Sequence, residues 1–162
     1  MFILNSMNKK IILNSLIFLG FIALSFAYFV EFVLGHEPCN LCKIERIPYI
    51  GSIIIISFLI FTNRWERILL SMTLLLFIFG AVTSVYHVGI EQGVFSESLL
   101  CEFGLNTNIQ NPEDLLKSLE KTPISCKDVT FKIFGLSLAT FNAFLSIVIS
   151  YILIRLLIKN EQ

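Results

Sequence analysis

Apolar residues along the chain fall into four long runs separated by polar stretches. The runs cover residues 11–34, 47–62, 68–90 and 133–158. A transmembrane helix needs about 20 mostly apolar residues, and the first, third and fourth runs are long enough. The second is shorter, but it opens with Ile47 and Pro48, and proline suits the first turn of a helix. The pattern therefore predicts four transmembrane helices, at about 11–34, 44–62, 68–90 and 133–158.

These helices predict an all-α membrane protein with a single domain, 1–162, folded as a four-helix bundle. Two loops, 35–46 and 91–132, then share one side of the membrane, and both termini share the other. In the long loop, Asn111 is a good helix N-cap and Pro112 suits the first helical position. We expect a short amphipathic helix there, which lies on the membrane surface or covers the helix ends.

The composition supports a membrane protein, because 56% of the residues are hydrophobic and only 15% are charged, against roughly a quarter in a soluble domain. A cleaved signal peptide is the alternative for the N-terminus, since Lys9 and Lys10 precede an apolar run and residues 25–27 resemble a cleavage site. The run continues to Leu34, longer than a signal core. We therefore interpret it as a transmembrane helix.

Basic residues do not orient this bundle clearly. Equal numbers lie on the terminus side (Lys9, Lys10, Arg64, Arg67, Arg155 and Lys159) and on the loop side (Lys43, Arg46, Lys117, Lys121, Lys127 and Lys132). Two of the loop residues, Lys117 and Lys121, are far from the helix ends, where positive charge counts most. The balance therefore favours cytoplasmic termini only slightly.

All four cysteines, Cys39, Cys42, Cys101 and Cys126, fall in the two loops on one face. In an oxidising compartment an even number indicates disulfides, and in the cytosol metal ligands or reduced thiols. A zinc site usually has two close pairs of ligands, and here only Cys39 and Cys42 are close. Both interpretations remain open from the spacing alone.

As disulfides, the two pairs would serve different purposes. A Cys101–Cys126 bond could stabilise the long loop by about 3 kcal/mol. A Cys39–Cys42 bond closes so small a ring that it removes little chain entropy and is easily reduced. The Cys-x-x-Cys motif is thus better suited to thiol exchange than to reinforcement.

Arg46 follows Cys42 by one helical turn, so the two side chains are expected on one face. A nearby cation and a helix N-terminus both lower a thiol pKa, which predicts a thiolate at Cys42. The alternative is an interfacial arginine that reaches lipid phosphate. A redox protein in the membrane without haem, flavin or iron–sulfur signatures needs an acceptor dissolved in the bilayer, and a quinone is the obvious candidate.

The chain resembles the DsbB family of bacterial inner-membrane disulfide-forming oxidoreductases. The resemblance is carried by the four helices, by Cys101 and Cys126 in a long second loop, and by three short segments. These are Pro38-Cys39-Asn40-Leu41-Cys42 with Arg46 behind it, Tyr86-His87-Val88-Gly89-Ile90-Glu91, and Phe134-Gly135-Leu136-Ser137-Leu138-Ala139. Where relatives often carry a tryptophan in the second loop, this chain has Phe131.

The resemblance implies an electron relay. Cys101–Cys126 would oxidise a DsbA-like periplasmic thioredoxin-fold protein, most directly at Cys101, and electrons would pass to Cys39–Cys42. Cys42 and Arg46 would then contact the quinone, either ubiquinone or menaquinone. It also implies a multi-pass protein of the bacterial inner membrane, with cytoplasmic termini and periplasmic cysteine loops. We expect membrane lipid and the DsbA-like protein as partners, and no nucleic acid.

His87 and Glu91 lie four residues apart at the end of the third helix, on the cysteine side. Reducing a quinone consumes two protons, and histidine titrates near neutrality, so we expect His87 close to the quinone. A purely structural His87–Glu91 hydrogen bond is the alternative. Two other functions remain open, a membrane metal-binding protein using the four cysteines and a non-catalytic subunit stapled by disulfides.

Overall fold

The computed structural model describes residues 2–62, 65–96, 101, 125–127, 131–133 and 135–159. Within these ranges, the long helices are α1 (Phe2–Phe32), α3 (Ile47–Thr62), α4 (Glu66–Glu91) and α7 (Leu138–Lys159). A short helix, α2 (Asn40–Ile44), leads into α3, and the described residues hold four apolar spans long enough to cross a membrane. The predicted four-span bundle is confirmed. The amphipathic helix predicted after Asn111 lies outside the described residues.

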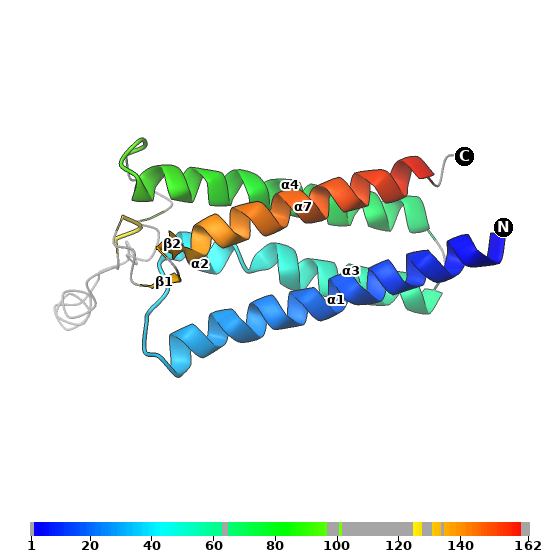
Figure 1. Ribbon diagram of the computed structural model, residues 1–162, viewed down its shortest axis with the longest axis horizontal. Helices are drawn as coiled ribbons and strands as arrows, with labels where there is room; N and C mark the ends of the chain where they lie inside the picture. Colours follow the sequence, from blue (N-terminus) through cyan, green and yellow to red (C-terminus); the bar gives the residue numbers. More distant parts are fainter. Residues whose placement is uncertain are drawn as a thin grey trace, which may run out of the picture.

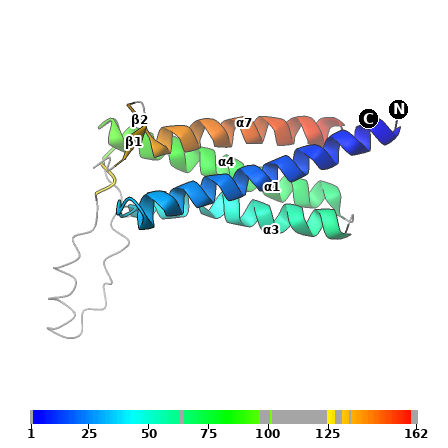
Figure 2. The same ribbon diagram turned by 60° about the horizontal axis from the view of Figure 1, so that its bottom comes forward.

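The helices run side by side along one long axis (Figure 1). α4 packs along α7 and α3, and α1 packs against α3. Both views place the two termini at one end of the bundle, together with the end of α3 and the start of α4 (Figure 2). The opposite end holds α2 and the strands β1 (Lys132–Ile133) and β2 (Leu136–Ser137).

One apolar core fills the middle of the bundle and draws on all four long helices. Its buried members are Leu13, Leu16, Tyr49, Ile56, Leu59, Leu70, Phe77, Ile149, Leu153 and Leu156. The outer faces are apolar as well, with Phe18, Phe61 and Phe144 largely exposed. Helices that are apolar all round suit lipid rather than water as surroundings.

α1 begins at Phe2, before the apolar run that was predicted to start at residue 11. Its polar first part includes Lys9, whose ammonium group is paired with the carboxylate of Glu66 at the start of α4. This ion pair connects two helices at the terminus end of the bundle.

α7 begins at Leu138, later than the apolar run that starts at residue 133, because a small antiparallel hairpin comes first. Gly135 in its turn has a φ of +83°, a left-handed conformation that favours glycine. Ser137 then accepts a hydrogen bond from the Thr140 N–H at 3.2 Å, the usual N-cap bond. The hairpin and this cap together set the start of α7.

The second span is broken between α2 and α3. The Arg46 N–H bonds the Lys43 carbonyl, and the Ile50 N–H bonds the Arg46 carbonyl, both at 3.2 Å. Pro48 has no N–H to donate to Ile44, and its ring clashes with the carbonyl of that residue in a continuous helix. The proline therefore explains why the chain turns at Glu45 and Arg46 before α3 begins.

Gly80 gives a test of helix packing, because a Cβ there would lie 3.0 Å from Pro48 Cγ of α3 and 3.4 Å from Ser146 Oγ of α7. We expect Gly80→Leu to lower the free energy of unfolding by about 1–3 kcal/mol through overpacking. Thermal unfolding of the protein in detergent measures this. Val82→Phe is the control, since Val82 is 64% exposed on the same helix. Equal destabilisation by both variants would contradict close packing at Gly80.

Candidate functional site

The Cys39–Cys42 pair lies at the start of α2, where Cys39 is the N-cap residue. The extended backbone of Cys39 lets its sulfur accept the Cys42 N–H at 3.3 Å. The two sulfurs are 2.9 Å apart and are both thiols in this structure. The helix start thus holds the two sulfurs of the motif next to each other.

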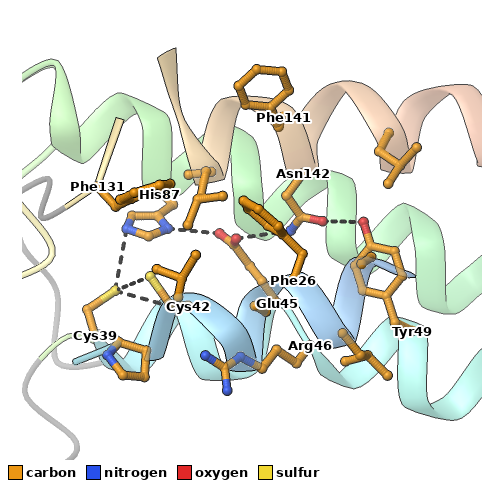
Figure 3. Close-up of a pocket in the computed structure, with 18 of the residues that line it drawn as sticks. Phe26, Cys39, Cys42, Glu45, Arg46, Tyr49, His87, Phe131, Phe141 and Asn142 are labelled. Atoms are coloured by element: carbon orange, nitrogen blue, oxygen red, sulfur yellow. Dashed lines mark hydrogen bonds and ion pairs between the residues drawn. The ribbon is translucent and has the colours of Figure 1, made fainter. Parts of the chain in front are cut away.

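His87 of α4 lies against this pair (Figure 3). Its Nε2 atom is 3.5 Å from Cys39 Sγ, and its Nδ1 atom is 2.9 Å from Glu45 Oε1. Glu91, the partner considered from the sequence, is more distant, with a carboxylate oxygen 3.8 Å from Nε2. His87 is only 3% exposed, so Glu45 determines which way the ring faces.

Glu45 is a site residue that the sequence analysis missed. It is 7% exposed, and its second oxygen accepts a hydrogen bond from Asn142 Nδ2 of α7 at 3.0 Å. The same Asn142 accepts a hydrogen bond from the Tyr49 hydroxyl and lies 2.7 Å from Ser84 Oγ. A continuous chain of contacts therefore runs from Cys39 through His87, Glu45 and Asn142 to Tyr49 (Figure 3).

One sequence signal could have identified Glu45. Burying a carboxylate within a membrane segment costs free energy, so such residues are usually functional. The sequence analysis did not consider Glu45, which directly precedes Arg46. In the structure, Glu45 contacts α4 and α7, whereas Arg46 contacts α1.

Arg46 faces α1. Its guanidinium bonds Glu31 at 2.5 Å and lies 4.8 Å from the centre of the Tyr28 ring. The Arg46 side chain is 13% exposed and that of Glu31 21%, so a half-buried ion pair fixes the arginine. Arg46 and Cys42 line the same cavity, and Glu31 holds the arginine there through the ion pair.

Cys101 and Cys126 form a disulfide, with their Cα atoms 5.9 Å apart. Both are buried, at 4% and 2% exposure, in one cluster with Cys39, Leu41 and Ile90. Asn40 also donates a hydrogen bond to the Cys101 carbonyl at 3.1 Å. All four cysteines are thus brought to one end of the bundle, and the disulfide excludes the alternative of four cysteines on one metal in this state.

A cavity of about 350 Å³ adjoins the cysteine pair, a volume typical of small-molecule sites. Its apolar lining comes mainly from α1 and α7, and includes Ala23, Phe26, Ala27, Val30, Leu138, Phe141 and Leu145. Its polar end holds Cys39, Cys42, Glu45, Arg46, His87 and Asn142. The cavity therefore has apolar walls from α1 and α7 and a polar end beside the sulfurs.

The contacts of Cys39 make it an acidic thiol. The hydrogen bond with the Cys42 thiol is the main cause that lowers the pKa of Cys39 from 9.0 to about 5. Burial raises this pKa, and the contact with His87 lowers it further. We expected the thiolate at Cys42, beside Arg46. In this state the contacts favour a thiolate at Cys39, because the Cys42 thiol and His87 both lie within hydrogen-bonding distance of its sulfur.

A membrane bundle with a dithiol and a disulfide buried together defines a membrane-embedded thiol–disulfide oxidoreductase. Comparison with known families gives the same class. The chain belongs to the family described as "Disulfide bond formation protein DsbB", which matches residues 9–156. Members of this family are thiol:quinone oxidoreductases, so the chain is a disulfide-generating membrane enzyme.

Among curated proteins, the chain is similar to an uncharacterized protein of Rickettsia prowazekii (strain Madrid E). The two are 30% identical over 142 residues, which cover 85% of this chain and 81% of that protein. No solved structure matches the chain.

The acidity of Cys39 predicts an unusual pH dependence of alkylation. Because a lowered pKa leaves Cys39 as thiolate at neutral pH, its rate with iodoacetamide should be nearly constant between pH 6 and 8. An ordinary thiol with a pKa of 9.0 reacts about tenfold faster per pH unit in this range. The measurement uses reduced protein with Cys101→Ser and Cys126→Ser, and mass mapping of the labelled residue.

Two variants make this test specific. Cys42→Ala removes the main hydrogen bond to Cys39, so the pH dependence should return. The reference thiol is Val94→Cys in a chain whose native cysteines are serine, since Val94 is 69% exposed. A Cys39 rate that rises as steeply as that of the reference would contradict the acidic thiol.

Proposed function

We propose that this enzyme reoxidises a DsbA-like thioredoxin-fold protein in the periplasm and passes the electrons to a membrane quinone. Cys39, Cys42, Cys101 and Cys126 are the reacting residues. The observation that carries the proposal is one buried cluster of both cysteine pairs, which adjoins a cavity with apolar walls. Electrons can thus move between sulfurs and leave towards the bilayer.

The first half of the relay is two thiol–disulfide exchanges. A thiolate of the partner attacks the Cys101–Cys126 disulfide, most directly at Cys101, and forms a mixed disulfide. The second thiolate of the partner resolves it, so the partner leaves oxidised and Cys101 and Cys126 become thiols. These thiols then reduce a Cys39–Cys42 disulfide in the same way. Two electrons and two protons move in each exchange.

The cavity fits a quinone, either ubiquinone or menaquinone. Phe26 and Phe141 belong to apolar walls suited to a ring and an isoprenoid tail, and Arg46 and His87 are donors for carbonyl oxygens. A bound quinone would supply the acceptor for two electrons and two protons. Cys42 would face it, His87 would hold a proton at Nε2 near the sulfurs, and Glu45 would keep the ring in that orientation.

We also propose cytoplasmic termini and periplasmic cysteine loops in the bacterial inner membrane. The Cys101–Cys126 disulfide supports this orientation, because disulfides persist in oxidising compartments and are rare in the cytosol. Both cysteine pairs cluster at the start of α2, and Figure 1 shows α2 at the end of the bundle opposite the termini.

The order of the relay can be tested with two substitutions and two electron donors. With a reduced thioredoxin-like partner, Cys39→Ser and Cys101→Ser should both abolish quinone reduction by the protein in lipid. With dithiothreitol, a small donor that needs no protein docking surface, Cys101→Ser should retain turnover and Cys39→Ser should not. Quinone absorbance follows both reactions.

Each variant is thus the control of the other. Retained turnover of Cys39→Ser with either donor would remove the Cys39–Cys42 pair from the electron path. Wild-type protein that reduces no quinone with either donor would refute the proposed function.

We expect Arg46 to contribute to quinone binding in addition to its ion pair with Glu31. Arg46→Gln should lower kcat/KM for quinone about ten- to a hundredfold, the usual effect of losing a hydrogen bond to a charged group. Arg155→Gln is a matched control, since Arg155 also stacks on a tyrosine, 5.5 Å from the Tyr151 ring, but lies far from the cavity. Equal losses in both variants would argue against a role of Arg46 at the quinone.

A further inference from the structure

Three potential metal ligands converge at the cysteine motif. The Cys39 and Cys42 sulfurs and His87 Nε2 all lie within 4.8 Å of one another. Nε2 is 3.5 Å from the Cys39 sulfur, and the two sulfurs are 2.9 Å apart. Figure 3 shows the His87 imidazole next to the two sulfurs, with Nε2 turned towards Cys39.

These separations are close to those of a zinc site. With Zn–S near 2.3 Å and Zn–N near 2.0 Å in a tetrahedron, two sulfur ligands lie about 3.8 Å apart and a sulfur and a nitrogen about 3.5 Å apart. The distance between Nε2 and the Cys39 sulfur already has this value. The sulfurs would have to separate by about 1 Å, which rotation of the cysteine side chains can supply.

Glu45 completes the resemblance to a metal site. Histidine ligands usually bond a carboxylate through their other ring nitrogen, which fixes the tautomer and the ring orientation. Here Glu45 Oε1 lies 2.9 Å from Nδ1, so the neutral imidazole that donates Nδ1–H to Glu45 has its Nε2 lone pair directed to the sulfurs. The proton that Nε2 would hold in the relay is lost when the cation binds. The nearest further oxygen ligand is Glu91 Oε1, 3.8 Å from Nε2.

We propose that the reduced Cys39–Cys42 pair and His87 bind a borderline-soft divalent cation of the zinc class. Binding displaces whatever protons the two sulfurs and His87 Nε2 hold, forms two metal–sulfur bonds and one metal–nitrogen bond, and transfers no electrons. Water or Glu91 takes the fourth position. Oxidation of the pair to a disulfide removes both thiolate ligands, so only the reduced state binds the cation.

This site differs from the four-cysteine metal site that the sequence left open. It uses two cysteines and a histidine, and it leaves Cys101 and Cys126 out. If the proposed function holds, a cation bound here also stops the relay, because neither sulfur is then free for exchange. The binding itself does not depend on quinone or partner.

The test is a titration of the reduced full-length protein in detergent with Co²⁺. Cys101→Ser and Cys126→Ser are present throughout, so that only two thiols remain. We expect one Co²⁺ per chain, thiolate charge-transfer and tetrahedral visible bands, and displacement by Zn²⁺. Cys39→Ser, Cys42→Ser and His87→Ala should each lose these bands, and circular dichroism checks that the variants are folded.

Two further variants separate the histidine site from general thiol binding. Glu45→Gln should weaken Co²⁺ binding about 10- to 100-fold, as loss of a carboxylate behind a histidine ligand usually does. His36→Ala is the matched control and should leave binding unchanged, because His36, the other histidine of the sequence, is not part of the Cys39–Cys42–His87 group. Unchanged bands in His87→Ala, or equal binding by the oxidised pair, would overturn the proposal.

A second measurement addresses the consequence for turnover. Zn²⁺ should inhibit quinone reduction by the wild-type protein, and a chelator should restore it. Inhibition without Co²⁺ binding at the pair would assign the effect to another site and overturn the link. Absence of any turnover without zinc would refute the proposed function, while the titration would still decide the metal site.

Discussion

The Glu45 carboxylate is buried where three helices meet, and the geometry of the site follows from its need for partners. A carboxylate in the interior of a membrane bundle is tolerated when it is paired and hydrogen-bonded. Its two oxygens are met by His87 of α4 and Asn142 of α7. Removing one partner of such a buried pair typically costs about 3–5 kcal/mol. These two contacts therefore hold the turn that contains Glu45 close to α4 and close to α7.

The break between α2 and α3 makes this arrangement possible. Pro48 ends the regular hydrogen bonding of the second span, and the chain turns at Glu45 and Arg46. The two neighbours then face opposite ways, Glu45 into the bundle and Arg46 to Glu31 on α1. On a water-exposed surface, two adjacent residues of opposite charge could pair with each other. Here Glu45 contacts His87 and Asn142, and Arg46 pairs with Glu31. The negative one orients His87, and the positive one remains at the cavity.

The sequence was sufficient for the bundle and for the cysteines, because both depend on patterns local in the chain. Long apolar runs predict spans, and the spacing of Cys39 and Cys42 indicates a redox motif. The contacts of Glu45 could not be predicted, since His87 is 42 residues away and Asn142 is 97. No periodicity relates such positions. The late start of α7 was missed because the Ser137 cap is one polar residue within an apolar run.

The sequence predicts the thiolate at Cys42, whereas the contacts of this reduced state favour Cys39, and the difference has a related reason. Spacing along a helix places Arg46 near Cys42, but it does not reveal that Glu31 binds the arginine. It also does not reveal that His87 reaches Cys39 from another helix. Electrostatic arguments from a single segment omit the charges that packing brings in, and in a medium of low dielectric constant those charges dominate.

The two residues inside the motif, Asn40 and Leu41, connect the cysteine pairs. Asn40 bonds the Cys101 carbonyl, and Leu41, 1% exposed, packs in the cluster that holds Cys39, Cys101 and Cys126. Exchange between two disulfides requires the sulfurs to approach directly, and these contacts keep both pairs in one dry cluster. Cys101 and Cys126 are equally buried, at 4% and 2% exposure, so attack on their disulfide by the proposed partner requires part of this packing to move. The residues between the cysteines thus control the approach of the pairs as well as the chemistry of the motif.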